Sequence, residues 1–320
     1  MILLITNKED VTVDFVVQEL RDRNCAYYRL NTEDIPDVVS VSFQISAGKY
    51  YLFDREKNVQ INLADVSAVY YRRPKISALG HISPLDEQEN QYLKSELYFL
   101  IHGIYKTLRD TFWINDVYKI REAENKIFQL QMAQATGFKI PFSIITNCFV
   151  DAKKMIEYHD CITKPIKSGN MPDPRHPKVI FTSVVDESSL RAPERLESFP
   201  CYFQENIEKE CDIRCIVVGE HVFAARIESQ GEPDGRVDWR KSSVILPHKK
   251  IQLPDTIEQK SISITRQLGL VYSAIDFVLD KAGNYIFLEC NPNGQWAWIE
   301  KRLGYQISSC IVDYLQKDEI

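Results

Sequence analysis

The sequence has no apolar run of membrane-spanning length, no low-complexity tract and no internal repeat. Of its 320 residues only 12 are glycine and 14 are proline, which leaves little room for long disordered segments. The apolar opening, residues 1–6, is too short for the core of a signal peptide and has no basic region before it. We therefore expect an ordinary folded protein of the cytoplasm, with no membrane partner.

Cysteine pairs at metal-binding spacing and a dense positive charge are also missing. The eight cysteines are scattered, and the one close pair, Cys211 and Cys215, has a spacing that fits neither a zinc ribbon nor a redox dithiol. The six histidines show no i, i+4 pair of the kind that binds a metal on one helix. A formal net charge of −6 argues against nucleic acid as a partner, because phosphate binding needs a dense cationic surface.

The length of the chain and the order of its apolar patterns predict an α/β (α+β) protein of several domains. A chain of 320 residues is too long for a typical single core, so two or three domains are expected. Residues 1–6 have the pattern of a buried strand, and apolar residues then recur at helical spacing over residues 11–23. Further strands are expected at residues 26–30, 39–45, 50–53, 66–71, 142–146, 160–163 and 201–207, a strand pair at 215–226, and helices at residues 86–109, 120–136, 152–159, 255–268 and 305–315. We place the first boundary near residues 113–118 and divide the chain into residues 1–116, 117–200 and 201–320.

The last sixth of the chain has the pattern of a metal site on two adjacent strands. Residues 271–288 are typical of a strand, a hairpin turn and a second strand. Pairing of these strands would bring Asp276, Glu289 and Asn291 together. Carboxylate and amide oxygens are ligands that magnesium prefers, and it usually keeps its other positions for water and substrate phosphates. A surface hairpin with solvated acids explains the same residues equally well.

Two lysines from different elements are candidates to bind phosphates. Lys126 lies in an expected helix led by Asn125, and Lys164 follows an expected strand. Two lysines that converge would supply the point charges that triphosphate binding uses. The connection at residues 164–179 contains a single glycine, so the signal for a phosphate-binding loop is weak there. A solvated side chain is the competing explanation for each lysine.

Several arginines stand at or near expected strand ends. Arg72 and Arg73 precede Pro74, which stops a strand, and ligands gather at the carboxyl ends of strands in open α/β sheets. Further charged candidates in the last segment are Asp212, Arg214, Arg226, Asp238 and Arg240. Arginines around a nucleotide would stabilise the negative charge that develops during phosphoryl transfer. Ion pairs between these arginines and nearby acids remain the alternative.

Taken together, these residues resemble the motifs of ATP-grasp ligases over nearly all of the chain. Residues 204–208 suit a hinge between domains whose backbone contacts an adenine edge while a nearby acid contacts ribose. The motifs occur in the order typical of that superfamily: Lys126, Lys164-Pro165, Gln204 to Ile207, Asp212 to Arg214, Arg226, Asp276-Phe277 and Glu289 to Pro292. Several independent motifs in one order are more specific than any one of them.

Within that superfamily the chain is most similar to the graspetide, or microviridin-type, peptide macrocyclases. The narrower resemblance is carried by residues 70–74 (Tyr-Tyr-Arg-Arg-Pro), residues 237–240 (Val-Asp-Trp-Arg) and the aromatic ending of residues 289–298. It implies an ATP-grasp fold with an N-terminal pre-ATP-grasp domain, a small central lid domain and a C-terminal domain, with ATP between the last two. It also implies a homodimer and a ribosomally made precursor peptide whose leader docks on the central domain, around the helix of residues 152–159 and the connection of residues 164–179.

The implied activity is ATP-dependent ring formation in that precursor. A Glu or Asp side chain of the precursor core is activated as an acyl phosphate, and a Thr or Ser hydroxyl or a Lys amine then attacks it. The product is a side-chain ester or amide ring, with ADP and phosphate released. The number of rings and the choice between ester and amide depend on the precursor.

The resemblance also assigns roles to individual residues. ATP phosphates would be bound by Lys126 and Lys164, adenine by Gln204, Glu205, Asn206 and Ile207, and ribose by Glu208 or Glu210. Magnesium would be bound by Asp276, Glu289 and Asn291. Catalytic roles on the γ-phosphate, the acyl phosphate or the acidic acceptor, in an order left open, would fall to Arg214, Arg226, Arg240 and Asp238. The substrate would be contacted by Arg72, Arg73, Asp212 and Arg214.

The chain departs from the family pattern in two places, and two other functions remain open. Cys290 replaces the usual aliphatic residue, and we expect its thiol to fill strand packing. The glycine-poor lid leaves the role of residues 167–170 undefined. A ligase that adds amino acids, such as glutamate, to a peptide tail would share almost all of these nucleotide residues. A non-catalytic peptide-binding homologue is the third possibility, although intact charged ligands speak against it.

Overall fold

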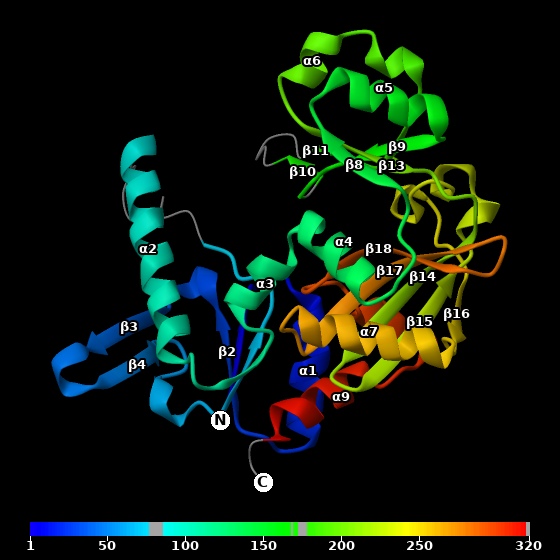
Figure 1. Ribbon diagram of the computed structural model, residues 1–320. Helices are drawn as coiled ribbons and strands as arrows, with labels where there is room; N and C mark the ends of the chain where they lie inside the picture. Colours follow the sequence, from blue (N-terminus) through cyan, green and yellow to red (C-terminus); the bar gives the residue numbers. More distant parts are fainter. Residues whose placement is uncertain (77–85, 168, 172–177, 318–320) are drawn as a thin grey trace.

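The computed structural model describes residues 1–76, 86–167, 169–171 and 178–317. Within these ranges the chain forms a parallel N-terminal sheet, a central antiparallel sheet and a C-terminal antiparallel sheet, in that order (Figure 1). A three-stranded and a two-stranded antiparallel sheet flank the first two. No helix of the described ranges is both long and apolar enough to cross a membrane.

The N-terminal sheet has the strand order β2-β1-β6-β7, and all of its pairs are parallel. Its strands are β1 (Ile2–Thr6), β2 (Tyr27–Asn31), β6 (Ala68–Tyr71) and β7 (Phe112–Ile114). Every residue of β1 is buried, which fits the centre of a parallel sheet covered on both faces. One face packs on α1 (Val11–Asp22), and the other packs on α2 (Glu87–Thr107). The three-stranded sheet is made of β3 (Val39–Gln44), β4 (Lys49–Asp54) and β5 (Val59–Asn62).

The single helix predicted over residues 120–136 is wrong, because the structure has two helices there. They are α3 (Val117–Ala123) and α4 (Lys126–Ala135). Asn125 separates them: its side-chain oxygen accepts hydrogen bonds from the backbone of Ile127 (3.0 Å) and Phe128 (3.1 Å). This is the usual geometry of a helix N-cap. Lys126 is therefore the first residue of a new helix.

The central sheet has the order β12-β9-β13-β8 and is antiparallel. Its strands are β8 (Ser143–Thr146), β9 (Cys161–Lys164), β12 (Ser183–Val185) and β13 (Cys201–Glu205). The helices α5 (Phe149–Tyr158) and α6 (Pro193–Glu197) cover it, and the short strands β10 (Asn170–Met171) and β11 (Lys178–Val179) form a hairpin beside it. Residues 201–207 were predicted to begin the last segment. In the structure β13 pairs with β9 and β8, so the strand that follows the predicted boundary at residue 200 belongs to the central sheet.

The C-terminal sheet has the order β16-β15-β14-β17-β18. Its strands are β14 (Lys209–Val218), β15 (His221–Ile227), β16 (His248–Ile251), β17 (Tyr272–Asp280) and β18 (Tyr285–Asn291). One face packs on α4 and α7 (Asp255–Gln267). The other face shares a core with α1, α8 (Ala297–Leu303) and α9 (Ile307–Leu315), so residues from both ends of the chain build one cluster.

We expect α9 to carry much of the stability of this shared core. The side chain of Ile311 is fully buried in the cluster that joins α1 and the C-terminal sheet, so Ile311→Ala should lower the free energy of unfolding by about 2 to 5 kcal/mol. Ile45→Ala is the matched control, because Ile45 is 77% exposed and its loss should change stability by less than about 0.5 kcal/mol. Urea unfolding of both variants measures the difference. Equal stability of the two variants would contradict the role of α9.

Candidate active site

Side chains alternate along β14 between two faces of the sheet: one packs on α4 and α7, and the other carries the candidate site. The odd-numbered residues from 211 to 217 pack against α4 and α7, so Arg214 lies on the opposite face. Arg214 stands directly opposite Asp276 on β17, which in turn stands opposite Glu289 on β18. Residues directly opposite each other share a face, and Asn291 follows Glu289 by two residues on that same face. The predicted convergence of these three side chains is confirmed.

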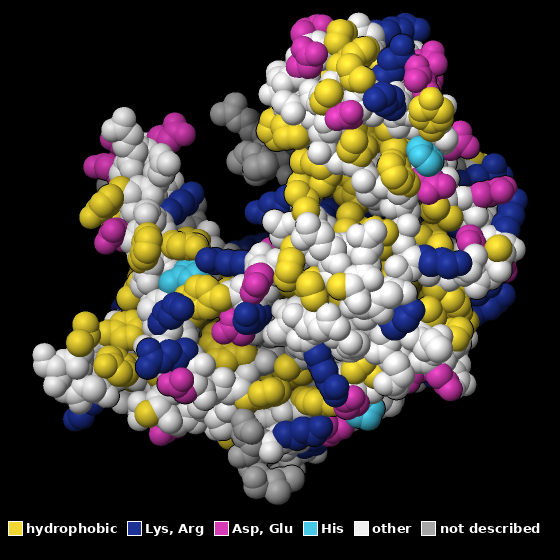
Figure 2. Space-filling model, in the orientation of Figure 1, with side chains coloured by type: hydrophobic (Ala, Val, Ile, Leu, Met, Phe, Trp, Pro, Cys, Tyr) yellow, Lys and Arg dark blue, Asp and Glu magenta, His cyan; other side chains and the backbone are white. Residues whose placement is uncertain are grey.

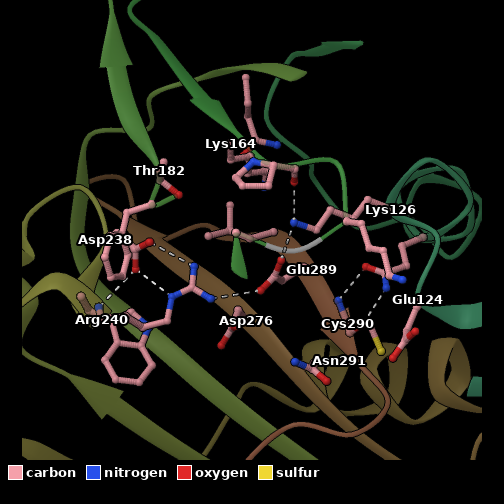
Figure 3. Close-up of a pocket in the computed structure, with 18 of the residues that line it drawn as sticks. Glu124, Lys126, Lys164, Thr182, Asp238, Arg240, Asp276, Glu289, Cys290 and Asn291 are labelled. Carbon is pink, nitrogen blue, oxygen red and sulfur yellow. Dashed lines mark hydrogen bonds and ion pairs between the residues drawn. The ribbon is translucent and has the colours of Figure 1, made fainter. Parts of the chain in front are cut away.

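A cavity of about 680 Å³ lies over this face, between the C-terminal sheet, the start of α4 and the central sheet (Figure 3). The predicted site residues that line it are Arg73, Lys126, Lys164, Gln204, Glu205, Asn206, Ile207, Asp212, Asp238, Arg240, Asp276, Glu289 and Asn291. Arg72, Glu208, Glu210, Arg214 and Arg226 are absent from its walls.

Glu289 lies between two cations that approach from opposite sides of the cavity (Figure 3). Its carboxylate is 3.4 Å from the Lys126 ammonium and 3.6 Å from the Arg240 guanidinium. Burial alone would raise the pKa of Glu289, but the charges of Lys126, Lys164 and Arg240 outweigh it and hold that pKa at about 2. Glu289 is therefore ionised at any physiological pH.

Asp276 is held by Arg214 beneath the floor of the cavity. Both carboxylate oxygens accept from Arg214 Nη1 at 2.8 Å, and Arg214 Nη2 donates to the carbonyl of Gln295 at 3.4 Å. Burial, with the negative charge of Glu289, raises the pKa of Asp276 in spite of Arg214. Gly294 explains how the loop after β18 comes this close: an added Cβ would lie 2.6 Å from Arg214 Nη2 and would overlap Ala274.

Lys164 projects into the cavity from the end of β9. Its ammonium lies 4.9 Å from the centre of the Tyr202 ring. Burial lowers the pKa of Lys164 to about 8. The charge of Glu289 raises this pKa, whereas the charges of Lys126 and Arg240 lower it further. Lys126 donates to the carbonyl of Pro165 at 3.0 Å, which places the two lysines at one wall.

A short 3-10 helix, Trp239–Lys241, presents Arg240 to the cavity. Asp238 clamps the guanidinium through two hydrogen bonds of 2.8 and 3.1 Å, and also accepts from the backbone of Arg240. Trp239 packs against Trp298 of α8 with ring centres 5.7 Å apart, and Lys241 donates to the carbonyl of Thr182 beside β12 at 2.6 Å. The expected ion pair of Arg240 with an acid thus exists, and it aims the guanidinium at Glu289.

The hinge residues line the cavity, but the two acids expected to contact ribose do not. The backbone N–H groups of Glu205 and Asn206 are bonded to the carbonyls of Phe142 and Asp160. Glu208 is exposed and pairs with Lys281. Glu210 pairs with Arg226 on the other face of the sheet, so the sequence prediction of a ribose contact has no support at either position.

Arg226 and Arg72 lie away from the positions that the sequence analysis expected. Arg226 stands opposite Ile213, on the face of the sheet that packs on α4 and α7, where it forms ion pairs with Glu210 and Glu228. Arg72 is only 1% exposed. It donates to Asp10 (2.9 Å), to the carbonyl of Gly294 (3.1 Å) and to Gln295 (3.2 Å), and is therefore a structural link between β6, α1 and the loop after β18.

Three residues that the sequence analysis did not single out contribute to the site. Gln129 of α4 donates to the carbonyl of Cys290 at 2.6 Å and accepts from its N–H at 3.0 Å, which fixes β18 beside Glu289. Lys209 binds Asp212 at 2.8 Å in the cavity wall. Glu124 also lines the cavity, and burial raises its pKa. A buried polar residue one turn after Lys126 is the only sequence signal for Gln129. Cys290 itself is buried in the strand packing, as expected.

The donor set at the end of β18 fits a magnesium ion. Asp276, Glu289 and Asn291 offer only hard oxygen ligands, which suits magnesium and leaves positions for phosphate oxygens. Among the described residues no group of three or more His, Cys, Asp or Glu side chains is placed to hold a metal, so a two-carboxylate, one-amide set is the candidate. The surrounding cations would then face the phosphates.

Glu289→Gln should weaken binding of magnesium–ADP about 10- to 100-fold, because one anionic ligand is lost while the shape of the side chain is kept. The fold should be unaffected, since Glu289 faces a cavity. Asp276→Asn should in addition lower the melting temperature, because the buried Arg214 loses the carboxylate that it binds at 2.8 Å. Calorimetric titration and thermal unfolding of both variants measure these effects. Unchanged magnesium–ADP affinity in Glu289→Gln would refute the assignment.

Lys164 should make nucleotide affinity depend on pH. With a pKa of about 8 in the free protein, the side chain is mostly a neutral amine above pH 8 and must take up a proton to pair with an anionic triphosphate, so affinity should fall as pH rises through 8. In Lys164→Arg the charge persists, and this fall should disappear. Dissociation constants of ATP at pH 7, 8 and 9 give the comparison. The same fall in both proteins would show that another group titrates.

Comparison with known proteins agrees with this geometry. Residues 1–121 match the model of the MvdD pre-ATP grasp domain, and residues 123–315 match the model of the RimK-like ATP-grasp domain. A curated relative, a probable alpha-L-glutamate ligase of Haemophilus influenzae, is 27% identical over 213 residues, which are 65% of this chain and 68% of the relative.

Solved structures resemble the whole chain. The macrocyclase MdnC of Microcystis aeruginosa MRC, bound with precursor peptide MdnA, has a TM-score of 0.86 at 28% identity and covers 99% of both chains. A RiPP-associated ATP-grasp ligase of Chryseobacterium gregarium, in complex with ADP and a leader and core peptide, has a TM-score of 0.89 at 29% identity over 99% of this chain and 96% of that one. The ATP-grasp ligase PsnB, complexed with minimal precursor, Mg and ADP, shares the fold with a TM-score of 0.77 at 22% identity, over 98% of this chain and 97% of that one. The expected ATP-grasp fold with a pre-ATP-grasp domain is thereby confirmed. The chain belongs to the RimK-like ATP-grasp family and, within it, to the graspetide-type macrocyclases that carry an MvdD pre-ATP-grasp domain.

Proposed function

We propose that this protein uses ATP and Mg²⁺ to close side-chain ester or amide rings in a ribosomally made precursor peptide. The observation that carries the proposal is the Asp276–Glu289 pair, held on one face of β17 and β18 in a cavity lined by Lys126, Lys164 and Arg240. Two carboxylates among cations are what a magnesium–triphosphate site needs. The family to which the chain belongs supports the same chemistry.

Magnesium held by Asp276, Glu289 and Asn291 would neutralise charge on the phosphates of ATP. Lys126 and Lys164 bind the triphosphate as point charges. Arg214 orients Asp276 and has no contact with the cavity, so we assign it a positioning role. The hinge residues 204–207 contact adenine, as the family resemblance suggests.

The reaction has two steps, and Arg240 serves both. In the first, a carboxylate oxygen of a precursor Glu or Asp attacks the γ-phosphorus, and the bond to ADP breaks. In the second, a hydroxyl oxygen or amine nitrogen of the same peptide attacks the acyl carbon, the bond to phosphate breaks, and the proton of the nucleophile passes to the released phosphate. Arg240, fixed by Asp238 and aimed at Glu289, stabilises the negative charge on the transferred phosphoryl group.

The precursor would be bound by two parts of the protein. Arg73 lines the cavity, and none of the described acids forms an ion pair with it, so its charge is available to an acidic core. The central domain exposes apolar side chains that suit a leader segment, with Phe142 stacked on His159 at 4.8 Å and with Val150 and Tyr158 largely exposed.

We further infer that the protein is a homodimer in the cytoplasm. Its eight free cysteines fit that compartment. Light scattering of the purified protein gives the mass of the assembly.

A glutamate-adding ligase is the second candidate, because the curated relatives carry that name and the nucleotide residues are common to both activities. The two reactions differ in the nucleophile. Ring closure uses a side chain of the same peptide, whereas tail ligation uses a free amino acid. The mass of the product therefore separates them.

Incubation of a candidate precursor peptide, rich in Thr, Glu and Asp, with enzyme, ATP and magnesium should yield products lighter by whole water molecules, about 18 Da each, because each ring condenses two side chains. Intact-mass spectrometry measures the loss. Glu289→Gln should give no mass loss, and omission of ATP should have the same effect. Mass gains that match added glutamate, in a mixture supplied with free glutamate, would establish the tail ligase instead.

A further inference from the structure

An aromatic and cationic surface lies outside the residues assigned so far, where α2 meets α3. We call it the α2–α3 face and define it by Tyr98, His102, Lys106, Tyr118 and Arg121. The rings of Tyr98 and His102 are 4.3 Å apart, and His102 Nδ1 is 3.2 Å from the hydroxyl of Tyr118. The Arg121 guanidinium lies over both tyrosine rings, at 5.7 and 5.9 Å from their centres, and donates to His102 Nε2 at 2.9 Å.

The two cations of this face are held by aromatic rings and not by ion pairs with the described acids. Lys106 lies 3.6 Å from the centre of the Tyr118 ring, and neither it nor Arg121 forms an ion pair with an acid of the described ranges. Burial, together with Arg121 and Lys106, lowers the pKa of His102, so the neutral ring can accept the hydrogen bond from Arg121. A cation stacked on an aromatic ring still attracts a carboxylate at its free edge.

The α2–α3 face is continuous with the candidate active site. Arg121, together with Val117, Ile120 and Glu124 of the same region, lines the cavity that holds Glu289. Only four residues lie between Arg121 and Lys126 in the sequence. Figure 2 shows hydrophobic, histidine and cationic side chains gathered at the foot of α2 and beside α3, at the edge of the hollow between α2 and the central domain. Tyr98 and Phe99 are 36% and 70% exposed, so apolar surface is available there.

We propose that the α2–α3 face binds an acidic segment of the peptide substrate and guides it into the cavity for acyl transfer. The inference rests on the proposed function for the identity of the peptide and adds the surface that selects it. An acidic peptide fits better than a nucleic acid, because two cations among aromatic rings supply far less charge than a phosphate backbone requires. Tyrosine and arginine are also the residues most often found at the centre of peptide interfaces.

The test compares two peptides on the wild type and on variants of this face. A fluorescein-labelled full precursor should bind the wild type more tightly than its leader segment alone, as measured by anisotropy. In Tyr98→Ala and in Arg121→Gln this advantage should shrink about tenfold, while the affinity for the leader segment stays unchanged. In Tyr98→Ala the affinity for ADP should also stay unchanged, because Tyr98 does not line the cavity. A precursor with Gln and Asn in place of its core Glu and Asp should lose the same advantage on the wild type.

Two control variants match these changes in residue type. Tyr92 is an exposed tyrosine of α2, about 120° around the helix from Tyr98, and Arg109 is an exposed arginine just beyond the end of α2. Tyr92→Ala and Arg109→Gln should leave the advantage of the full precursor intact. Thermal unfolding of each variant shows that the fold is kept.

An unchanged advantage in both Tyr98→Ala and Arg121→Gln would overturn the inference, as would equal binding of precursor and leader by the wild type. Loss of a dimer in these variants with the advantage retained would make the face a subunit interface and would overturn it as well. Because binding is measured without turnover, the outcome is separate from the mass-loss experiment. Binding as expected without any mass loss would count against the proposed function alone.

Discussion

The cavity depends on two carboxylates being held side by side away from bulk water. Asp276 and Glu289 occupy directly opposed positions on neighbouring strands, where like charges repel and burial penalises both. Cations on three other elements offset that cost: Arg214 beneath Asp276, Lys126 from α4 and Arg240 from a short loop. The same cations would face the phosphates of a bound triphosphate.

The N-terminal domain is part of this arrangement, because its strands and helices fix the loop that follows β18. Asp10 caps α1 with one oxygen and accepts from Arg72 with the other. Arg72 then reaches the carbonyl of Gly294, which also accepts from the hydroxyl of Tyr272 at 2.8 Å. Trp296, fully buried, donates to the hydroxyl of Tyr70 at 3.2 Å. The segment after Asn291 is therefore held by two domains. A shift between these domains would move the candidate metal ligands.

Local sequence patterns predict those parts of the site that depend only on the strand period and on the geometry of a hairpin. The strand, turn and strand of residues 271–291 predict the meeting of Asp276, Glu289 and Asn291, because side chains alternate with period two and a short turn sets the register. The face of the sheet on which Arg226 lies could not be predicted in this way, because it depends on how β15 pairs with β14. It also did not give the burial of Arg72, which is fixed by contacts with residues more than 200 positions away.

The resemblance to ATP-grasp ligases could be read from the sequence, because several motifs occur in one order along the chain. The two strands that carry Asp276 and Glu289 could be predicted as well, because they follow from residue types at short spacing. The tertiary structure decided which charged side chains share the cavity. The cavity walls exclude Arg72, Glu208, Glu210 and Arg226, and Arg214 lies beneath them as a support for Asp276. The additional members of the site are Glu124, Gln129 and Lys209. The reason is physical: a charged residue is placed by its partners, and those partners come from sheets and helices that are distant in sequence.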